Sequence, residues 1–223
     1  IGQFSFLMLM FFLMIVGIIY VEQGQRRIPI QFAKRVRGRK VMGGQSTYIP
    51  LKVNSAGVIP VIFATSILFF PALVATSLPQ DNSVTAAIRN WIDVNLANSQ
   101  GTTWFYIFFL GILIIFFTYF YTTIQFDPVR QSDMIRRQGG FIPGVRPGPS
   151  TTNYLSHILN RITLPGSIFL ASVAVLPSIA SAIWDIPLGF SGISILITVG
   201  VALETMKQIE SQLSMRNYEG FID

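Results

Sequence analysis

The 223-residue sequence contains no cysteine and a single histidine, His157. The absence of cysteine excludes disulfides, thiolate metal sites and cysteine nucleophiles from these residues. Charged residues are scarce as well, because Asp, Glu, Lys and Arg make up 12% of the sequence, against about 25% in soluble domains. Hydrophobic residues make up 51%. This composition is typical of a membrane protein and argues against a soluble one.

Five long stretches of the sequence carry no charged residue. They are residues 1–21, 53–80, 94–126, 162–184 and 186–203. An α-helix needs about 20 mainly apolar residues to cross about 30 Å of hydrocarbon. We therefore expect an all-α membrane protein, a polytopic bundle with five transmembrane helices. The sequence begins at Ile1 inside an apolar stretch, without a charged flank, so we expect it to be one segment of a longer chain.

The basic residues are concentrated in two loops. Residues 22–52 contain eight Lys and Arg against one acid, and residues 127–150 contain four Arg against two acids, whereas residues 79–103 are nearly balanced. Short loops rich in Lys and Arg remain in the cytoplasm. This asymmetry predicts that both basic loops are cytoplasmic and that residues 79–103 are external.

The expected organisation starts with a transmembrane helix at 1–21, a basic cytoplasmic loop with a β-hairpin at 22–52, a transmembrane helix at 53–78 and an external loop at 79–103. It continues with a transmembrane helix at 104–126, a second basic cytoplasmic loop at 127–153 and a transmembrane helix at 154–184. An external turn at 185–190, a transmembrane helix at 191–212 and a cytoplasmic tail at 213–223 complete it.

The first loop shows a strand pattern. Ile28, Ile30 and Phe32 alternate with polar residues or proline within QRRIPIQFAK, and TYIPLKV follows further along the loop. Alternation with a period of two is typical of β-strands. We therefore expect a short β-hairpin that projects from the membrane and has a basic tip at 35–40. The tip either anchors the adjacent helices by its charge or binds an acidic or polyanionic partner.

The second loop contains QGGFIPGVRPGPS at 138–150. Its glycines and prolines favour a structured turn and disfavour a helix. It lacks the Gly-Lys-Ser/Thr ending that a phosphate-binding loop requires.

Polar residues within the predicted spans are few and uncharged. We expect most of their hydroxyl groups to donate to their own helix backbone. Ion-coupled transporters usually keep ionisable residues at the membrane midplane, and intramembrane hydrolases need a nucleophile with a base or a metal with its ligands. The sequence offers neither set, which predicts no enzyme activity, no catalytic residue, no metal site and no cofactor.

These exclusions favour a conduit or receptor for something delivered from the cytoplasm. Half of a small-solute or ion-coupled secondary transporter is the alternative. A membrane scaffold that only recruits ribosomes through its basic hairpin is a third interpretation.

Two parts of the sequence resemble a known family. They are GQRRIPIQFAKRVRGRK with STYIPLKVNSAGVIPVIFATSILFFP, and FDPVRQSDMIRRQGGFIPGVRPG with TTNYLSHILNRITLPGSIFLASVAVLP. Both closely resemble the SecY family of protein-translocation channels, and the similarity covers essentially the whole chain. The match is to the C-terminal half of a bacterial member, from its sixth to its tenth transmembrane helix. It implies a channel in the bacterial plasma membrane that passes unfolded preproteins and releases membrane segments through a lateral gate.

The resemblance also implies roles for particular residues. Ile62 and Ile197 match an apolar pore ring, and Asn54, Ser66 and Phe70 match positions that face the pore or the lateral gate. The basic loops would bind the ribosome (rRNA and exit-tunnel proteins) or the ATPase SecA through Arg26, Arg27, Lys34, Arg35, Arg37, Arg39, Lys40, Arg136, Arg137 and Arg146. The other implied partners are SecE, SecG, signal peptides, nascent polypeptides and lipids.

Overall fold

The computed structural model describes residues 2–32, 35–37, 40–42, 46–77, 83–96, 103–184 and 191–219. In chain order, they form α1 (Gly2–Gln23), β1 (Gln25–Phe32), β2 (Arg35–Arg37), β3 (Lys40–Met42), β4 (Ser46–Lys52), α2 (Ile59–Ser77), α3 (Ser83–Asn95), α4 (Trp104–Gln125), α5 (Pro128–Arg137), β5 (Gly140–Phe141), α6 (Pro149–Trp184) and α7 (Gly192–Glu219). Within these residues, five helical stretches are long and apolar enough to cross a membrane: α1, α2, α4 with α5, α6 and α7. The predicted bundle of five spans is confirmed.

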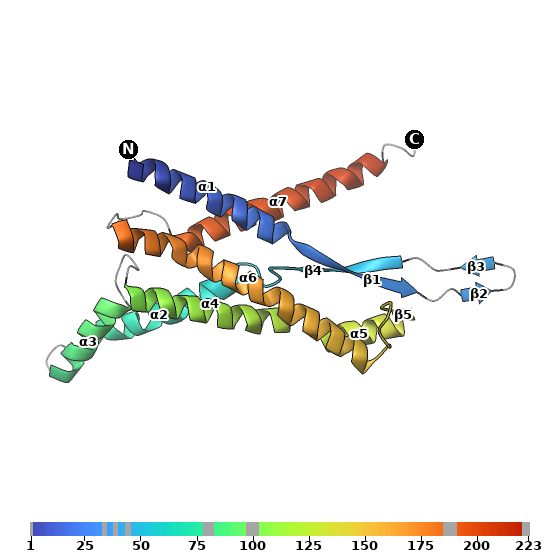
Figure 1. The fold of residues 1–223 in the computed structure, drawn as a ribbon, viewed down its shortest axis with the longest axis horizontal. Coiled ribbons are helices and arrows are strands. Elements are labelled where there is room, and N and C mark those ends of the chain that lie inside the picture. The colour runs from blue at the N-terminus through green and yellow to red at the C-terminus, as the bar shows by residue number, and fades with distance from the viewer. Residues whose placement is uncertain are drawn as a thin grey trace.

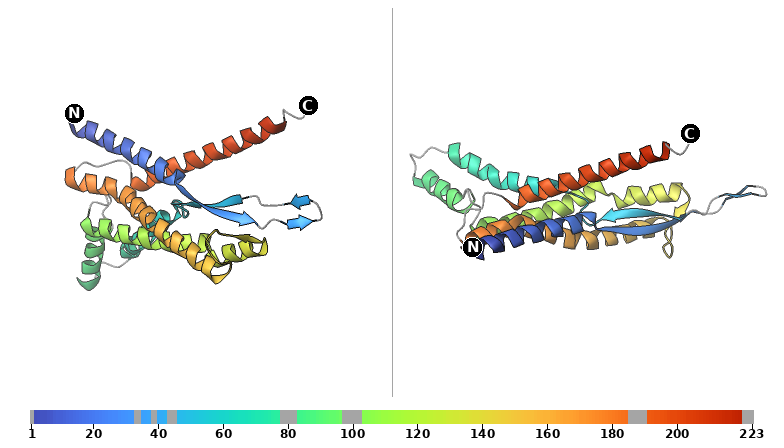
Figure 2. Two further views of the ribbon diagram at one scale, coloured as in Figure 1. Left: turned by 45° about the vertical axis from the view of Figure 1, so that its right-hand side comes forward. Right: turned by 90° about the horizontal axis from the view of Figure 1, so that it is seen from above.

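Helix α6 runs diagonally through the molecule and packs against α4 and α7, while α2 packs along α4 (Figure 1). Figure 2 shows the hairpin, α5 and the C-terminal end of α7 at one end of the bundle, and α3 at the other. We call these the loop end and the far end. The charge asymmetry predicts that the loop end faces the cytoplasm.

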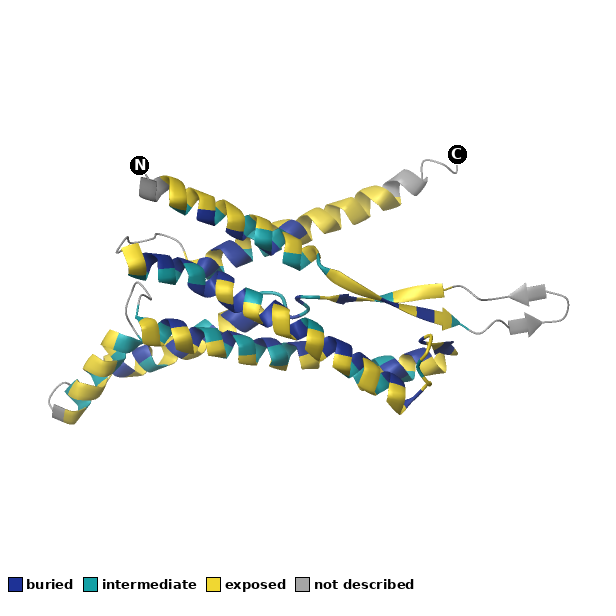
Figure 3. Cartoon of the chain, viewed as in Figure 1, coloured by how far each residue is buried: buried dark blue, intermediate teal, exposed yellow. Residues whose placement is uncertain are grey.

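The main core lies between the long helices. Its most deeply buried members include Val61 and Ala64 of α2, Ile114 of α4 and Leu170 of α6. Each long helix buries only part of its surface, and large apolar side chains remain exposed on the other faces (Figure 3). Such faces suit contact with lipid or with further helices.

The predicted β-hairpin is present. β1 pairs antiparallel with β4, from Gln25 opposite Lys52 to Gln31 opposite Ser46. β5 adds a third strand on the other side of β1, where Phe32 lies opposite Gly140. The strands β2 and β3 pair with each other further along the same loop. The structure therefore joins the two basic loops through one small sheet.

A second apolar cluster fixes this sheet to the bundle. Ile28, Ile30 and Leu51 of the hairpin pack with Ile135 of α5 and Leu155 of α6. Helix α6 has 36 residues, about 54 Å at 1.5 Å per residue, which exceeds the hydrocarbon thickness of about 30 Å. Its length therefore leaves several turns for contacts outside the hydrocarbon, and its first turns form part of this cluster.

The structure differs from the sequence predictions in several element boundaries. Residues 83–95 form the helix α3 within the segment predicted as an external loop. α6 starts at Pro149 instead of 154, because proline suits the first turn of a helix, where its missing N–H is not needed. The second span starts at Ile59, six residues after the predicted start. Helices α2 and α6 also continue through their internal prolines, Pro71 in α2 and Pro165 and Pro177 in α6.

Gly166 of α6 lies directly against the segment that connects the hairpin to α2. A Cβ atom at Gly166 would lie 2.6 Å from the carbonyl oxygen of Val53, a backbone atom that cannot rotate away. Gly166→Ala should therefore displace the hairpin base and lower the free energy of unfolding by about 1–3 kcal/mol. Thermal unfolding of the purified complex in detergent measures the loss.

The matched control is Gly111→Ala in α4, where a new Cβ would meet nothing within 4 Å. This substitution should stabilise its helix by about 0.5–1 kcal/mol. An equal change in melting temperature for the two variants would contradict the close approach of α6 to Val53.

Candidate functional site

Helix α2 has one buried and one exposed face. Val61, Ala64 and Leu68 are buried against the bundle, whereas the predicted pore residues Ile62 and Phe70 are 42% and 65% exposed. Ser66 lies between these two on the same face, and its Oγ donates to the Ile62 carbonyl at 2.8 Å. Within the part of the chain that the structure describes, no helix covers the face of α2 that carries the three predicted pore positions.

Ile197 of α7 lies at a depth similar to that of Ile62. The two helices run in opposite directions, and a Cβ at Gly200 would lie 3.8 Å from Val58, just before α2. Ile62 lies four residues beyond Val58, and Ile197 lies three residues before Gly200. Both therefore lie about 4.5–6 Å from this contact, towards the far end. Ile197 is partly buried.

A polar cavity of about 310 Å³ opens where α1, α2 and α7 converge at the loop end. The residues before α2 form one wall and the middle of α7 forms another. Its polar lining includes Glu22, Lys52, Asn54, Gln125, Glu204 and Lys207.

Asn54 is the most buried polar side chain of this cavity, with 4% of its surface exposed. Its Nδ2 donates to the Glu22 carboxylate at 2.9 Å and to the Gly57 carbonyl at 3.2 Å. Its Oδ1 has no hydrogen-bond partner within the described residues. Because both protons of the amide are committed, any further partner of Asn54 has to donate a hydrogen bond to Oδ1.

The second basic loop is rigidly built, as its glycines and prolines predict. Gly144 and Gly148 have φ values of 82° and 110°, in the region that favours glycine. The Ser132 hydroxyl of α5 donates to the Gly148 carbonyl at 3.1 Å, and Thr151 donates to the Arg146 carbonyl at 2.9 Å. Arg146 is exposed on this fixed loop.

Other predicted loop residues lie at the same end. Arg136 and Arg137 are exposed in the last turn of α5, where cations are favourable beside the negative end of the helix dipole. Arg26 and Arg27 lie in the first residues of β1, at the base of the hairpin, and the Arg27 guanidinium lies 4.8 Å from the Tyr48 ring centre. Arg35, Arg37 and Lys40 belong to β2 and β3, whereas Lys34 and Arg39 lie outside the described residues.

The sequence did not predict that the two basic loops are one docked unit. Ile28 and Ile30 could have indicated this contact. Their large apolar side chains lie on one face of β1 and need an apolar surface to pack against. The structure supplies this surface from α5 and from the first turns of α6.

Hydroxyl groups in the spans behave as predicted. Those that donate to a carbonyl three or four residues earlier in the same helix include Thr65, Ser66, Thr118, Thr123, Ser167, Ser172 and Thr198. Over the described ranges, no group of three or more His, Asp or Glu side chains is arranged to hold a metal ion.

The fold is similar to that of solved protein-translocation channel structures. It is similar to a solved structure described as a protein conducting channel, with a TM-score of 0.56 and 18% identity over 90% of this chain and 47% of that one. A solved SecY structure, studied for its plug domain, gives a TM-score of 0.53 and 16% identity over 90% of this chain and 48% of that one. At these identities the similarity concerns the fold alone.

Sequence comparison identifies the family. The SecY family model matches residues 1–206. The protein translocase subunit SecY of Streptomyces scabiei is 50% identical over 99% of this chain and 49% of its own length. That of Mycobacterium tuberculosis is 50% identical over 94% of this chain and 48% of its own length. The chain belongs to the SecY family, is a multi-pass membrane protein, and spans about half the length of the curated relatives it matches.

Glu22 should hold Asn54 in place. Glu22→Ala removes the acceptor of a buried amide proton, which should lower the free energy of unfolding by about 1–3 kcal/mol. Glu22→Gln keeps an acceptor oxygen and should retain most of the stability. Glu204→Ala is the control, because Glu204 lines the same cavity but is exposed. A loss in Glu204→Ala as large as that in Glu22→Ala would show that the Asn54 contact has no special role.

Proposed function

We propose that this chain forms about half of the wall of a protein-conducting channel that passes unfolded preproteins across the bacterial plasma membrane. The observation that carries the proposal is the exposed face of α2 with Ile62, Ser66 and Phe70. Another part of a SecY-type protein would face it across the pore. The relatives are translocase subunits, which does not favour the transporter interpretation.

Ile62 and Ile197 would belong to the pore ring. Their similar depth on two helices of opposite direction supports this role. Apolar side chains at a narrow neck exclude water and ions, yet they yield to many different side chains of a moving polypeptide. The ring would therefore seal the channel without recognising any particular sequence.

Asn54 would contribute to the lateral gate. A buried acceptor without a partner is costly, so its Oδ1 favours a closed state in which a donor from the rest of the channel reaches it. Opening would break that hydrogen bond and let signal peptides pass between α2 and the opposite wall into lipid. The gate would then resist opening by only a modest free energy.

The docked loop unit would bind the cytoplasmic partners. The unit lies at one end of the bundle (Figure 2) and is supported by the apolar cluster beneath the hairpin. Its Lys and Arg residues suit rRNA phosphates or an acidic protein surface. We assign the hairpin to the ribosome and Arg146 mainly to SecA. The energy for transport would come from SecA, the ribosome or the proton-motive force, since this chain would have no enzymatic activity. SecE and SecG would complete the assembly.

The double substitution Ile62→Ser and Ile197→Ser should wet the neck of the channel. We expect a higher resting ion conductance, because the barrier to ions comes from dewetting. Single-channel current on the reconstituted complete complex measures it. The control is Ile168→Ser, at a position of α6 that is 52% exposed. An unaltered resting conductance in the double variant would remove both isoleucines from the pore.

Charge reversal separates the two proposed partners. Arg37→Glu with Arg39→Glu and Lys40→Glu should weaken ribosome binding and reduce its salt dependence by about 0.7–0.9 in log–log slope for each lost phosphate contact. Arg146→Glu should instead impair SecA-driven export. Arg89→Glu, at the far end of the bundle, is the control for a charge reversal outside the loops and changes the net charge as much as Arg146→Glu does. If the triple variant keeps the affinity and salt slope of the unmodified complex, the hairpin serves only as an anchor.

A further inference from the structure

Helix α3 lies outside the spanning helices, yet it exposes an apolar stripe. Val84, Ile88 and Trp91 are 70%, 48% and 52% exposed. At about 100° per residue, these three positions lie within about 60° of one another on the helix surface. A soluble surface rarely keeps such large side chains together unless something covers them.

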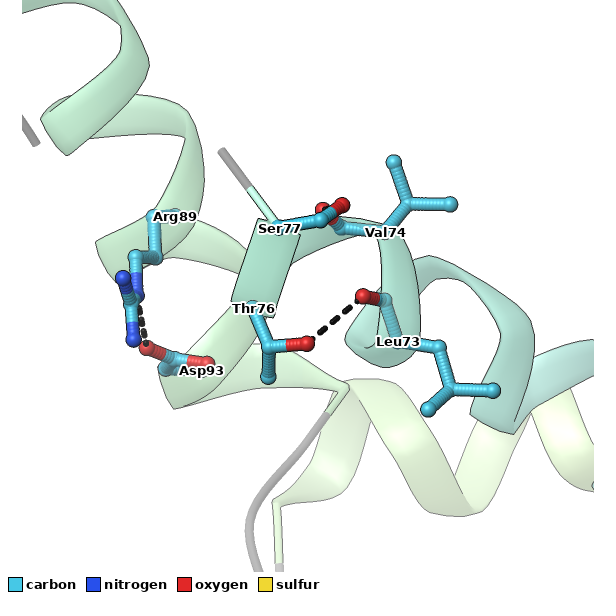
Figure 4. A network of polar contacts seen from close by, with 6 residues as sticks. All are labelled: Leu73, Val74, Thr76, Ser77, Arg89 and Asp93. Atoms are coloured by element: carbon cyan, nitrogen blue, oxygen red, sulfur yellow. Dashed lines mark hydrogen bonds and ion pairs between the residues drawn. The ribbon is translucent and has the colours of Figure 1, made fainter. Parts of the chain in front are cut away.

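The charged residues of α3 lie on another face. Arg89 and Asp93 form an ion pair with a nitrogen–oxygen distance of 3.7 Å. Both lie at least about 100° around the helix from each member of the stripe. Figure 4 shows this pair together with Thr76 and Ser77, in the last turn of α2, the helix against which α3 packs. The helix is therefore amphipathic along its described length.

Contacts with α4 fix the rotation of α3 about its own axis. The Thr103 hydroxyl, just before α4, donates to the Val94 carbonyl at 3.0 Å. The rings of Trp91 and Phe105 meet edge to face at 5.5 Å, and Leu96 packs against the main core. The stripe therefore points in a defined direction.

That direction continues an exposed aromatic surface of α4, a helix long and apolar enough to span a membrane. Phe105 stacks on Phe109 at 5.9 Å, and both rings are about 40% exposed, at 41% and 42%, on a helix that spans the membrane. Trp91 thus extends the aromatic face of α4 beyond the start of this helix. Trp104, the first residue of α4, is 63% exposed, and tryptophan is enriched where membrane meets water. Since both surfaces join without a break, the same medium covers them.

We propose that α3 is an interfacial helix whose Val84–Ile88–Trp91 stripe inserts into the lipid surface at the far end of the bundle. Helices of this kind bury their apolar face about 5–10 Å into the boundary between headgroups and acyl chains. The Arg89–Asp93 pair remains in the aqueous layer. By this contact α3 holds the ends of α2 and α4 at the bilayer surface. That the leaflet is the outer one rests on the proposed topology.

Site-directed spin labelling tests the proposal, and these 223 residues contain no native cysteine that would have to be replaced. Ile88→Cys on the stripe and Asn90→Cys on another face are labelled with a nitroxide in the complete complex, in phosphatidylcholine–phosphatidylglycerol vesicles. Oxygen concentrates in lipid, whereas a nickel chelate stays in water. At position 88 oxygen collisions should exceed nickel collisions several-fold, and at position 90 the ratio should reverse. Val84→Cys provides the same test if the Ile88 variant does not assemble.

Two results would overturn the proposal. A label at position 88 that meets the nickel chelate as often as the label at 90 would place the stripe in water. A label shielded from both reagents would show that a protein surface covers it. Adding the nickel chelate to one side of the vesicles reports separately which side Asn90 faces. An error in the topology is therefore distinguishable from an absence of lipid contact.

Discussion

Packing against α6 holds the two parts of this structure together. The helix buries residues in the main core, such as Leu170, and in the cluster beneath the hairpin, such as Leu155. Because it is 36 residues long, it extends past the hydrocarbon and supports the sheet formed by both basic loops. Gly166 lets the chain after β4 pass directly against it. Packing against α6 therefore determines where both basic loops and the start of α2 lie.

Uneven burial is the second property from which function follows. α2 is packed against α4 on one face and open on the other, and in lipid such a face needs either acyl chains or another helix. Asn54 is also incompletely hydrogen-bonded. Its side-chain amide donates hydrogen bonds to Glu22 and Gly57, whereas its Oδ1 accepts none from the described residues. Both features indicate a wall that further protein completes, in agreement with relatives about twice as long as this chain.

The sequence predicted much of this organisation for a physical reason. Charge-free runs have few alternatives to spanning helices, and the alternation at Ile28 and Ile30 had few alternatives to a strand. Helix α3 was missed because its Val84, Ile88 and Trp91 are separated by small and polar residues in a segment rich in turn-forming residues. The docking of the sheet on α6 depends on contacts between residues about 130 positions apart, which no local pattern reports. The pore and gate assignments came from family resemblance, because isoleucine at positions 62 and 197 has no local signature that separates a pore lining from lipid contact.

The central claim is that the exposed face of α2 lines the path of a translocating polypeptide. Cross-linking from single photoreactive residues tests it most directly, with a preprotein stalled in the assembled complex. A probe at Ser66 should cross-link to the preprotein, whereas a probe at Phe108, which is 68% exposed on α4, should react mainly with lipid. Preprotein cross-links from Phe108 as strong as those from Ser66, or none from Ser66 during transport, would contradict the account.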